Sequence, residues 1–216
     1  MEVGETVNTE GRPLALGAAA PEGAQGEERP LRFGCAIRAL LACGWRAMVL
    51  IFRRGIHQPA GNIGRCIAFA DGTTAEVYRE TVIDCPPLQR PAVLVVCFRL
   101  RGIRREWGHS LFRLESELNT VLFAGFPGLV SKLWLRHDQR GVYRGLYQWD
   151  DPERAVEYVR ALWWALAAVS EPGSIHYAVL PGLDRDEVVT NPAVVDTRAA
   201  APGGWWRPAG VAARSA

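Results

Sequence analysis

The sequence predicts an α+β protein whose central domain follows the element order β-α-β-β-α-β. Two patterns indicate this order: short apolar or alternating segments typical of strands, and two longer segments with apolar residues at helical spacing. The composition agrees, because 49% hydrophobic and 22% charged residues are typical of a soluble globular protein. The order covers about 90 residues and corresponds to the split-βαβ, or ferredoxin-like, arrangement.

By composition, the chain of 216 residues divides into four segments. Residues 1–30 are rich in Gly, Glu and Ala and poor in aromatics, which predicts a disordered tail. Residues 31–90 form an extension with one amphipathic helix and one β-hairpin. Residues 91–182 form the ferredoxin-like domain. Residues 183–216 are expected to be a mostly irregular tail, in which the Trp205-Trp206 pair would dock on the folded body.

Residues 31–54 are predicted to form one amphipathic helix. Their apolar residues at helical spacing are Phe33, Ile37, Leu40, Leu41, Trp45, Met48 and Phe52. Arginines interrupt any run long enough to span a bilayer, which needs about 20 apolar residues. The helix either packs on its own domain, the more common outcome, or lies on an anionic membrane surface, as basic amphipathic helices can.

A hairpin is predicted over residues 63–83. Two strand-like segments flank Asp71-Gly72, a dipeptide suited to a two-residue type I′ turn. The Pro-rich stretch 85–91 then breaks regular structure and separates this hairpin from the domain that follows.

The domain begins with the strand 92–100, which is apolar on both faces. A helix over 107–123 follows, with an apolar stripe at helical spacing. The strands 129–136 and 142–149 flank a polar turn. A second helix runs to about residue 170; its start is marked by Asp151 as the N-cap and Pro152 at the first helical position. The last strand is 174–180.

Both helices of such a domain lie on one face of an antiparallel sheet. The other face cannot be left to water, because the strand 92–100 is apolar on both sides. A second copy of the sheet is the simplest cover, which predicts a homodimer.

Several classes of function find no support in the sequence. A net charge of +2 gives no general case for nucleic acid. The five cysteines include no CxxC pair and the four histidines are scattered, so neither a disulfide framework nor a metal site is expected. Nucleotide-binding and nucleophile-elbow motifs are absent, and no cofactor is predicted. A haem could be held only through one axial histidine, His109 or His176.

The N-terminus has no apolar run typical of a secretory signal. A cytoplasmic protein is therefore expected, which would be peripheral at the membrane if helix 31–54 docks there.

The stretch "FAGFPGLVSKLWL", followed by "YRGLYQWDDPERAVEY", resembles the dimeric α+β barrel superfamily. Within it, the chain is similar to the YdhR-like monooxygenases and, more distantly, to the antibiotic-biosynthesis monooxygenases. The resemblance covers roughly residues 91–182. It implies a ferredoxin-like domain that dimerises. The superfamily includes cofactor-independent oxygenases, polyketide cyclases, haem-handling enzymes and binding proteins, so the resemblance indicates the fold more closely than the reaction.

Lys132 is the only lysine in the chain, beside 24 arginines. Strand alternation puts Val130, Lys132 and Trp134 on one face, and Ser131, Leu133 and Leu135 on the other. If the leucines lie under the helices, Lys132 points into the barrel cleft, where desolvation would lower the pKa of its amine. It could then stabilise an enolate or phenolate. Alternatively, its stem packs on Trp134 and its ammonium group reaches solvent or a carboxylate.

Further candidates lie on helix 107–123 and on the neighbouring strand. His109 lies off the apolar stripe and could act as a general base near neutral pH, or could be a surface or interface residue. Phe112 and Asn119 share its side of the helix; Asn119 could orient a carbonyl or hydroxyl group, or could be structural. Tyr147 could form a wall of the cleft, although aromatic residues in strands more often serve packing.

These observations favour a cofactor-independent monooxygenase acting on a small aromatic or polyketide-like molecule. Lys132 and His109 would be catalytic, and Trp134, Asn119, Phe112 and Tyr147 would bind the substrate. Two alternatives stay open: a non-catalytic ligand-binding or accessory module, associated with a membrane surface through residues 31–54, and a polyketide cyclase or isomerase on the same fold.

Overall fold

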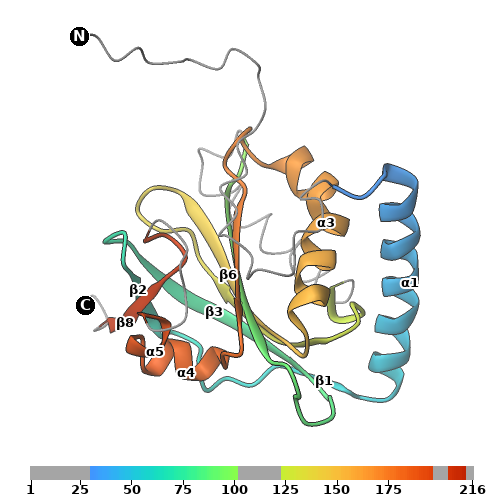
Figure 1. Ribbon diagram of the computed structural model, residues 1–216, viewed down its shortest axis with the longest axis horizontal. Helices are drawn as coiled ribbons and strands as arrows, with labels where there is room; N and C mark the ends of the chain where they lie inside the picture. Colours follow the sequence, from blue (N-terminus) through green and yellow to red (C-terminus); the bar gives the residue numbers. More distant parts are fainter. Residues whose placement is uncertain (1–29, 102–122, 197–203, 213–216) are drawn as a thin grey trace, which may run out of the picture.

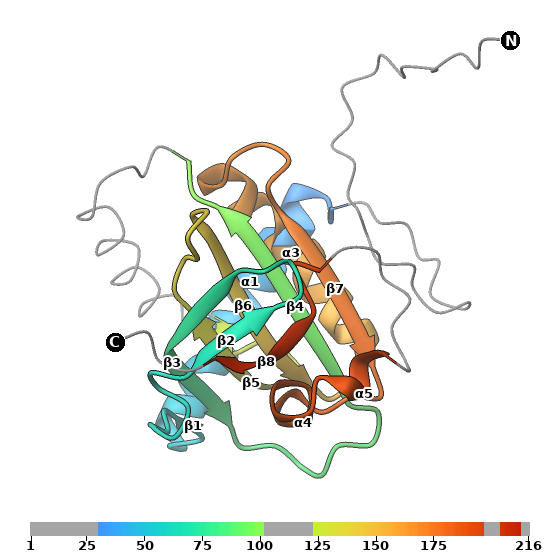
Figure 2. The same ribbon diagram turned by 90° about the vertical axis from the view of Figure 1, so that its left-hand side faces the viewer.

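A computed structural model describes residues 30–101, 123–196 and 204–212. An antiparallel sheet runs through these residues in the order β7-β4-β6-β5-β3-β2-β8, and β1 pairs with β3. Two helices, α1 and α3, lie on one side of the sheet with α1 outermost, while α4 and α5 lie on the other side, beside the edge strand β8 (Figures 1 and 2). The elements are α1 (Phe33–Phe52), β1 (Ile56–His57), β2 (Cys66–Phe69), β3 (Thr74–Ile83), β4 (Ala92–Arg99), β5 (Leu129–Leu135), β6 (Val142–Trp149), α3 (Pro152–Val169), β7 (His176–Pro181), α4 (Arg185–Thr190), α5 (Ala193–Asp196) and β8 (Pro208–Ala212).

The α+β class predicted from the sequence is confirmed. The strands β4, β5, β6 and β7 and the helix α3 lie close to their predicted positions. Asp151 caps α3 as predicted, because its side chain accepts a hydrogen bond from the Glu153 amide, and Pro152 is the first helical residue. The predicted helix 107–123 lies outside the described residues, apart from Phe123.

The turn of the first hairpin differs from the predicted type I′. The Gly72 amide donates to the Phe69 carbonyl at 3.0 Å, and the Phe69 amide donates to the Thr73 carbonyl at 2.9 Å, so the loop has three residues. Gly72 has φ +79°, whereas Asp71 keeps a negative φ. This is a type I turn closed by a left-handed glycine. The Asp71 side chain explains the preference, since it accepts hydrogen bonds from the Thr73 amide and hydroxyl.

The C-terminal residues are more regular than predicted. The segment after residue 182 contains α4, α5 and the strand β8, which pairs with β2. Trp206 is buried in the core between the sheet and α4, and Trp205 packs against the same core. A single sequence gives little sign of this strand, because Pro208–Ala212 has neither alternation nor a β-branched run.

The sheet face that was expected to need a second subunit is covered within the chain. Its core residues from the central strands include Val93, Val95 and Leu133, and they pack with Val188 of α4 and Trp206. The curled sheet therefore encloses one apolar core, and the helices α1 and α3 cover a second core on its other face. The homodimer stays a prediction, but the observation that motivated it is accounted for inside one chain.

Candidate functional site

Lys132 lies on the face of the sheet covered by α1 and α3. The predicted alternation is confirmed, because Leu133 and Leu135 belong to the opposite core, which α4 and β8 close. The expected arrangement, with the two leucines beneath the helices and Lys132 in a cleft on the other face, is therefore wrong. Lys132 instead points into the layer between the sheet and α3, and only 5% of its surface is exposed.

A β-bulge in β3 brings Arg79 to the same face of the sheet as Lys132. Val77 pairs with Leu135 and Arg79 with Trp134, so the register shifts at Tyr78. Without the bulge, Val77 and Arg79 would point to the same side. With it, Val77 joins the core closed by β8, while Arg79 reaches the ring of Trp134.

The amine of Lys132 lies among three aromatic rings. Its Nζ is 3.1 Å from the centre of the Trp134 ring, 4.6 Å from that of Tyr147 and 4.9 Å from that of Phe123. The Arg79 guanidinium carbon lies 4.2 Å from the centre of the Trp134 ring. A cation over an aromatic face is attracted to it electrostatically, which offsets part of the cost of burial.

Two hydrogen bonds hold these rings in place. The indole Nε1 of Trp134 donates to the Thr81 hydroxyl at 3.1 Å, across the β3–β5 pair. The Tyr158 hydroxyl of α3 donates to the Tyr147 hydroxyl at 3.2 Å. Phe123 packs on Trp134 and on Tyr158 with ring centres about 6 Å apart. The aromatic walls are therefore fixed by the sheet on one side and by α3 on the other.

Burial moves the titration of this cluster toward neutral groups. The pKa of Lys132 is lowered well below its ordinary value, first by burial and then by the charge of Arg79, and no carboxylate within the described part of the chain offsets these effects. Burial also raises the pKa of Tyr147 and of Tyr158. The cluster thus favours a neutral, proton-accepting amine beside two protonated phenols.

The structure brings together three of the six predicted site residues, Lys132, Trp134 and Tyr147. The other three, His109, Phe112 and Asn119, lie outside the described residues, and their roles stay predictions. Arg79, Thr81 and Tyr158 also belong to this cluster, and the sequence does not predict them there. The bulge in β3 and the approach of α3 bring them there, and neither leaves a short-range signal in the sequence.

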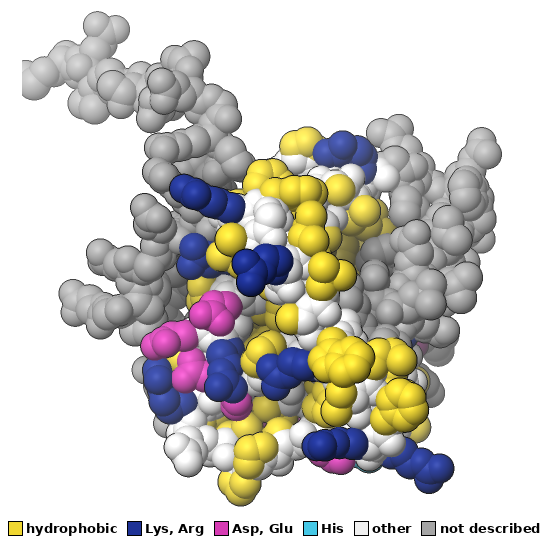
Figure 3. All heavy atoms as spheres, turned by 90° about the vertical axis from the view of Figure 1, so that its right-hand side faces the viewer, with side chains coloured by type: hydrophobic (Ala, Val, Ile, Leu, Met, Phe, Trp, Pro, Cys, Tyr) yellow, Lys and Arg dark blue, Asp and Glu magenta, His cyan; other side chains and the backbone are white. Residues whose placement is uncertain are grey.

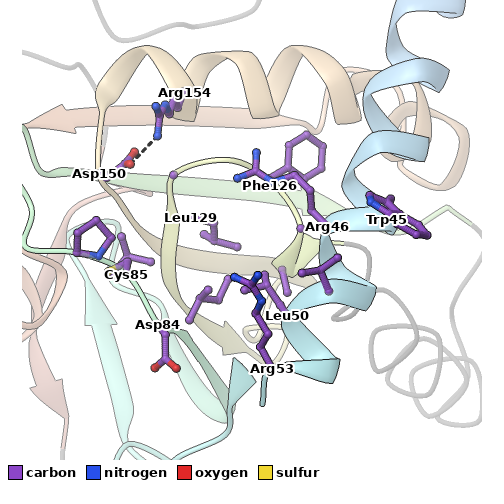
Figure 4. Close-up of a pocket in the computed structure, with 17 residues that line it drawn as sticks. Trp45, Arg46, Leu50, Arg53, Asp84, Cys85, Phe126, Leu129, Asp150 and Arg154 are labelled. Atoms are coloured by element: carbon purple, nitrogen blue, oxygen red, sulfur yellow. Dashed lines mark hydrogen bonds and ion pairs between the residues drawn. The ribbon is translucent and has the colours of Figure 1, made fainter. Parts of the chain in front are cut away.

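A pocket of about 430 Å³ opens beside the cluster, between α1 and the start of β5 (Figure 4). Val130, two residues before Lys132, lines it. Arg46 and Arg53 contribute from α1, and Asp84 and Asp150 from the other side.

The charges of this pocket are only partly paired. Asp150 pairs with Arg154 at 2.6 Å and Asp84 with His57 at 2.9 Å. Within the described residues, Arg46 and Arg53 have no acidic partner within ion-pair distance. The pocket therefore combines apolar walls with a surplus of positive charge on the α1 side.

A second pocket, of about 340 Å³, lies on the opposite face of the sheet and has a different character. Arg144 donates there to Asp138 at 2.6 Å and to Asp71 at 2.9 Å, and both its guanidinium and the Asp138 carboxylate are buried. Cys97 and His176 are cross-strand neighbours beside it. Burial raises the pKa of the Cys97 thiol to about 12 and lowers that of His176, so Cys97 is not an activated nucleophile.

Within the described ranges 30–101, 123–196 and 204–212, no group of three His, Cys, Asp or Glu side chains is placed to hold a metal ion. His176 contacts Trp205, with ring centres 5.7 Å apart, and lies on the face of the sheet opposite Lys132. A role for it at the Lys132 cluster is therefore ruled out by position.

Comparisons with known proteins find no matching family model and no matching curated protein. Among solved structures, an uncharacterized ferredoxin-fold protein from Listeria monocytogenes 4b F2365, described as related to antibiotic biosynthesis monooxygenases, is similar. It shares 12% identity at a TM-score of 0.40 over 63% of this chain and 88% of that one. A protein described as a major regulator of staphylococcal pathogenesis shares 16% identity at a TM-score of 0.32 over 62% of this chain and 89% of that one. Likenesses this distant leave the function to be argued from the site.

Proposed function

We propose that the chain is a cofactor-independent monooxygenase that acts on a small aromatic or polyketide-like molecule at Lys132. The observation that carries the proposal is a single lysine, buried among three aromatic rings, whose pKa is lowered by burial and by Arg79. A general base works best when its pKa lies near the operating pH, and burial is the usual way in which a lysine reaches that range.

In this proposal the neutral Lys132 amine removes a proton from an acidic CH₂ group of the substrate. The resulting carbanion gives one electron to O₂, and the two radicals combine to a hydroperoxide. The hydroperoxide loses water, so that CH₂ and O₂ become C=O and H₂O without an external reductant. Trp134, Tyr147 and Phe123 supply flat apolar walls for an aromatic substrate. His109 is proposed as the second polar residue, with Asn119 and Phe112 as supports.

Oxygen uptake by the full chain tests the proposal, with anthrone-type and other acidic phenolic compounds as probes. The wild type should consume one O₂ for each carbonyl formed. Lys132→Met should lower the turnover number by about 10² to 10⁴, the usual contribution of a general base. Arg136→Met, which removes an exposed cation just after the same strand, is the matched control and should leave turnover unchanged.

Other outcomes would point to the two alternatives. Conversion of a probe without oxygen uptake and without change of mass would indicate cyclisation or isomerisation. Binding without conversion of any probe would indicate a ligand-binding module. Full turnover by Lys132→Met would contradict the role of the lysine.

A further inference from the structure

The outward face of α1 is apolar, and no other described residue covers it. Trp45 is 73% exposed and Phe52 is 82% exposed, and hydrophobic side chains gather over this face of the molecule (Figure 3). The large exposed apolar residues of the helix are Phe33, Ile37, Leu41, Trp45, Met48, Ile51 and Phe52. The apolar surface continues onto α3, because Phe33 contacts the half-exposed Trp164 with ring centres 6.4 Å apart. A contiguous exposed apolar patch of this kind marks an interaction surface.

The arginines of α1 lie along one flank of this face. At about 3.6 residues per turn, the apolar residues fall within roughly one third of the circumference. Arg38 lies directly beside Trp45 at the edge of this stripe, while Arg53 and Arg46 lie about a quarter turn further round, where they also line the pocket between α1 and β5. None of the three has an acidic partner among the described residues. Residues 31–70 contain six Arg and neither Asp nor Glu. The surface therefore has an unbalanced positive edge.

The helix is held flat against the body by its inner face. Ala36, Cys43 and Ala47 are buried there, and the backbone of Cys43 approaches Gly125 so closely that a side chain at that glycine would overlap it. Contrary to the expectation from its arginines, α1 is long and apolar enough to cross a membrane, the one such helix in the described part of the chain, with a mean hydropathy of 1.7. Because one side packs on α3 and the sheet, the other side is available along its full length, which suits an interfacial position and not a spanning one.

We propose that the outward face of α1 docks on the surface of an anionic lipid bilayer, with the helix axis parallel to the membrane plane. Charge complementarity carries this choice of partner. Trp45, Phe33 and Phe52 have the ring types found at the boundary between headgroups and acyl chains, and the flanking arginines would meet lipid phosphates. A second copy of the same face would bring like charges together, since the helix offers no carboxylate to pair them.

Flotation of the full chain with vesicles tests this docking. The probes are vesicles of phosphatidylcholine alone and vesicles in which about a third of the lipid is phosphatidylglycerol. Wild-type protein should float with the anionic vesicles at least about tenfold more than with the neutral ones. Both Trp45→Glu and Phe52→Glu should lower this binding by about tenfold or more, because each places a carboxylate where an apolar ring enters the interface.

Two further variants separate the apolar and the charged contributions. Val211→Glu makes the same apolar-to-acid change on the exposed side of β8, across the molecule from α1, and should bind as the wild type does. The double variant Arg46→Gln, Arg53→Gln should retain weak binding that no longer distinguishes anionic from neutral vesicles. Circular dichroism of each variant should match that of the wild type, because the changed side chains are exposed.

Three results would overturn the proposal. The first is wild-type protein that floats with neither kind of vesicle. The second is binding that Trp45→Glu and Val211→Glu lower equally. The third is a wild-type dimer that Trp45→Glu dissociates while vesicles fail to bind, which would assign the face to a second copy of the chain.

Discussion

The Nζ atom of Lys132 lies 3.1 Å from the centre of the Trp134 ring, two residues further along the same strand. Arg79 approaches the same ring from β3, with its guanidinium carbon 4.2 Å from the ring centre. The amine of Lys132 and the guanidinium of Arg79 therefore face the same indole, and when the lysine is protonated the two charges repel each other. The lysine can give up its charge, whereas the arginine cannot at any ordinary pH. This difference makes Lys132 the group that titrates.

Replacing Lys132 with methionine should stabilise the protein near neutral pH. The pKa of Lys132 is lower in the folded chain than in the unfolded one, so the unfolded chain binds more protons between the two values. The contribution of Lys132 to stability should therefore rise with pH up to about 10.4, the unfolded value. Lys132→Met removes this linkage and should raise the free energy of unfolding at pH 7 by about 1 kcal/mol or more, the value of one pKa unit.

Urea unfolding at several pH values between about 7 and 10 measures this effect. The advantage of the methionine variant should shrink as the pH rises. An advantage that stays constant with pH would contradict the lowered pKa.

Arg144→Met should destabilise the fold strongly. Its partners Asp138 and Asp71 would be left as carboxylates without their cation, and Asp138 is fully buried. Breaking one side of a buried ion pair costs about 3 to 5 kcal/mol. Arg140→Met, which changes an exposed residue of the turn before β6, should change the free energy of unfolding by about 0.5 kcal/mol or less. Equal effects of the two substitutions in urea unfolding would refute the structural role of Arg144.

Gly125→Ala should displace α1. The added methyl group would overlap the Cys43 carbonyl and lie 2.9 Å from the Ala47 amide nitrogen, and both are backbone atoms of the helix. Overpacking of this kind costs about 1 to 3 kcal/mol. Gly34→Ala, in the first turn of the same helix, meets nothing within 4 Å and should be neutral or stabilising by up to about 1 kcal/mol. A Gly125→Ala protein with an unchanged melting temperature would show that the helix is not packed this closely.

Trp206→Ala should show that the C-terminal strand belongs to the core. Trp206 is almost fully buried against the enclosed face of the sheet, and removal of a core tryptophan costs about 3 to 5 kcal/mol. Trp45→Ala removes an exposed ring and should cost about 0.5 kcal/mol or less. Thermal unfolding of the two variants compares them directly. Similar melting temperatures would mean that residues 204–212 add little to the folded body.

Local pattern was sufficient for the elements whose determinants are close in sequence. Alternation located β5 and β6, and the cap formed by Asp151 and Pro152 located the start of α3. The same alternation placed Lys132 and Trp134 on one face of their strand. These predictions succeeded because each depends on residues that are only a few positions apart in the sequence.

The rest depends on contacts between distant segments. The bulge at Tyr78 decides which face Arg79 joins, and the pairing of β8 with β2 decides that the enclosed core needs no second subunit for cover. The ion pairs of Arg144 join residues 71, 138 and 144, two of which read from sequence only as turn residues. The predicted type of the Asp71-Gly72 turn was wrong for a local reason, because the side-chain hydrogen bonds of Asp71 favour the three-residue loop.

The titration of Lys132 tests the central claim most directly. Because the chain has one lysine, uniform labelling of lysine with carbon-13 gives a single set of side-chain signals that needs no assignment. The Cε resonance, followed by NMR from about pH 5 to about pH 11, reports the protonation of Nζ. A midpoint well below 10.5 that rises when Arg79 is replaced by methionine is the predicted result. A midpoint near the ordinary lysine value would contradict a buried neutral base and, with it, the proposed reaction.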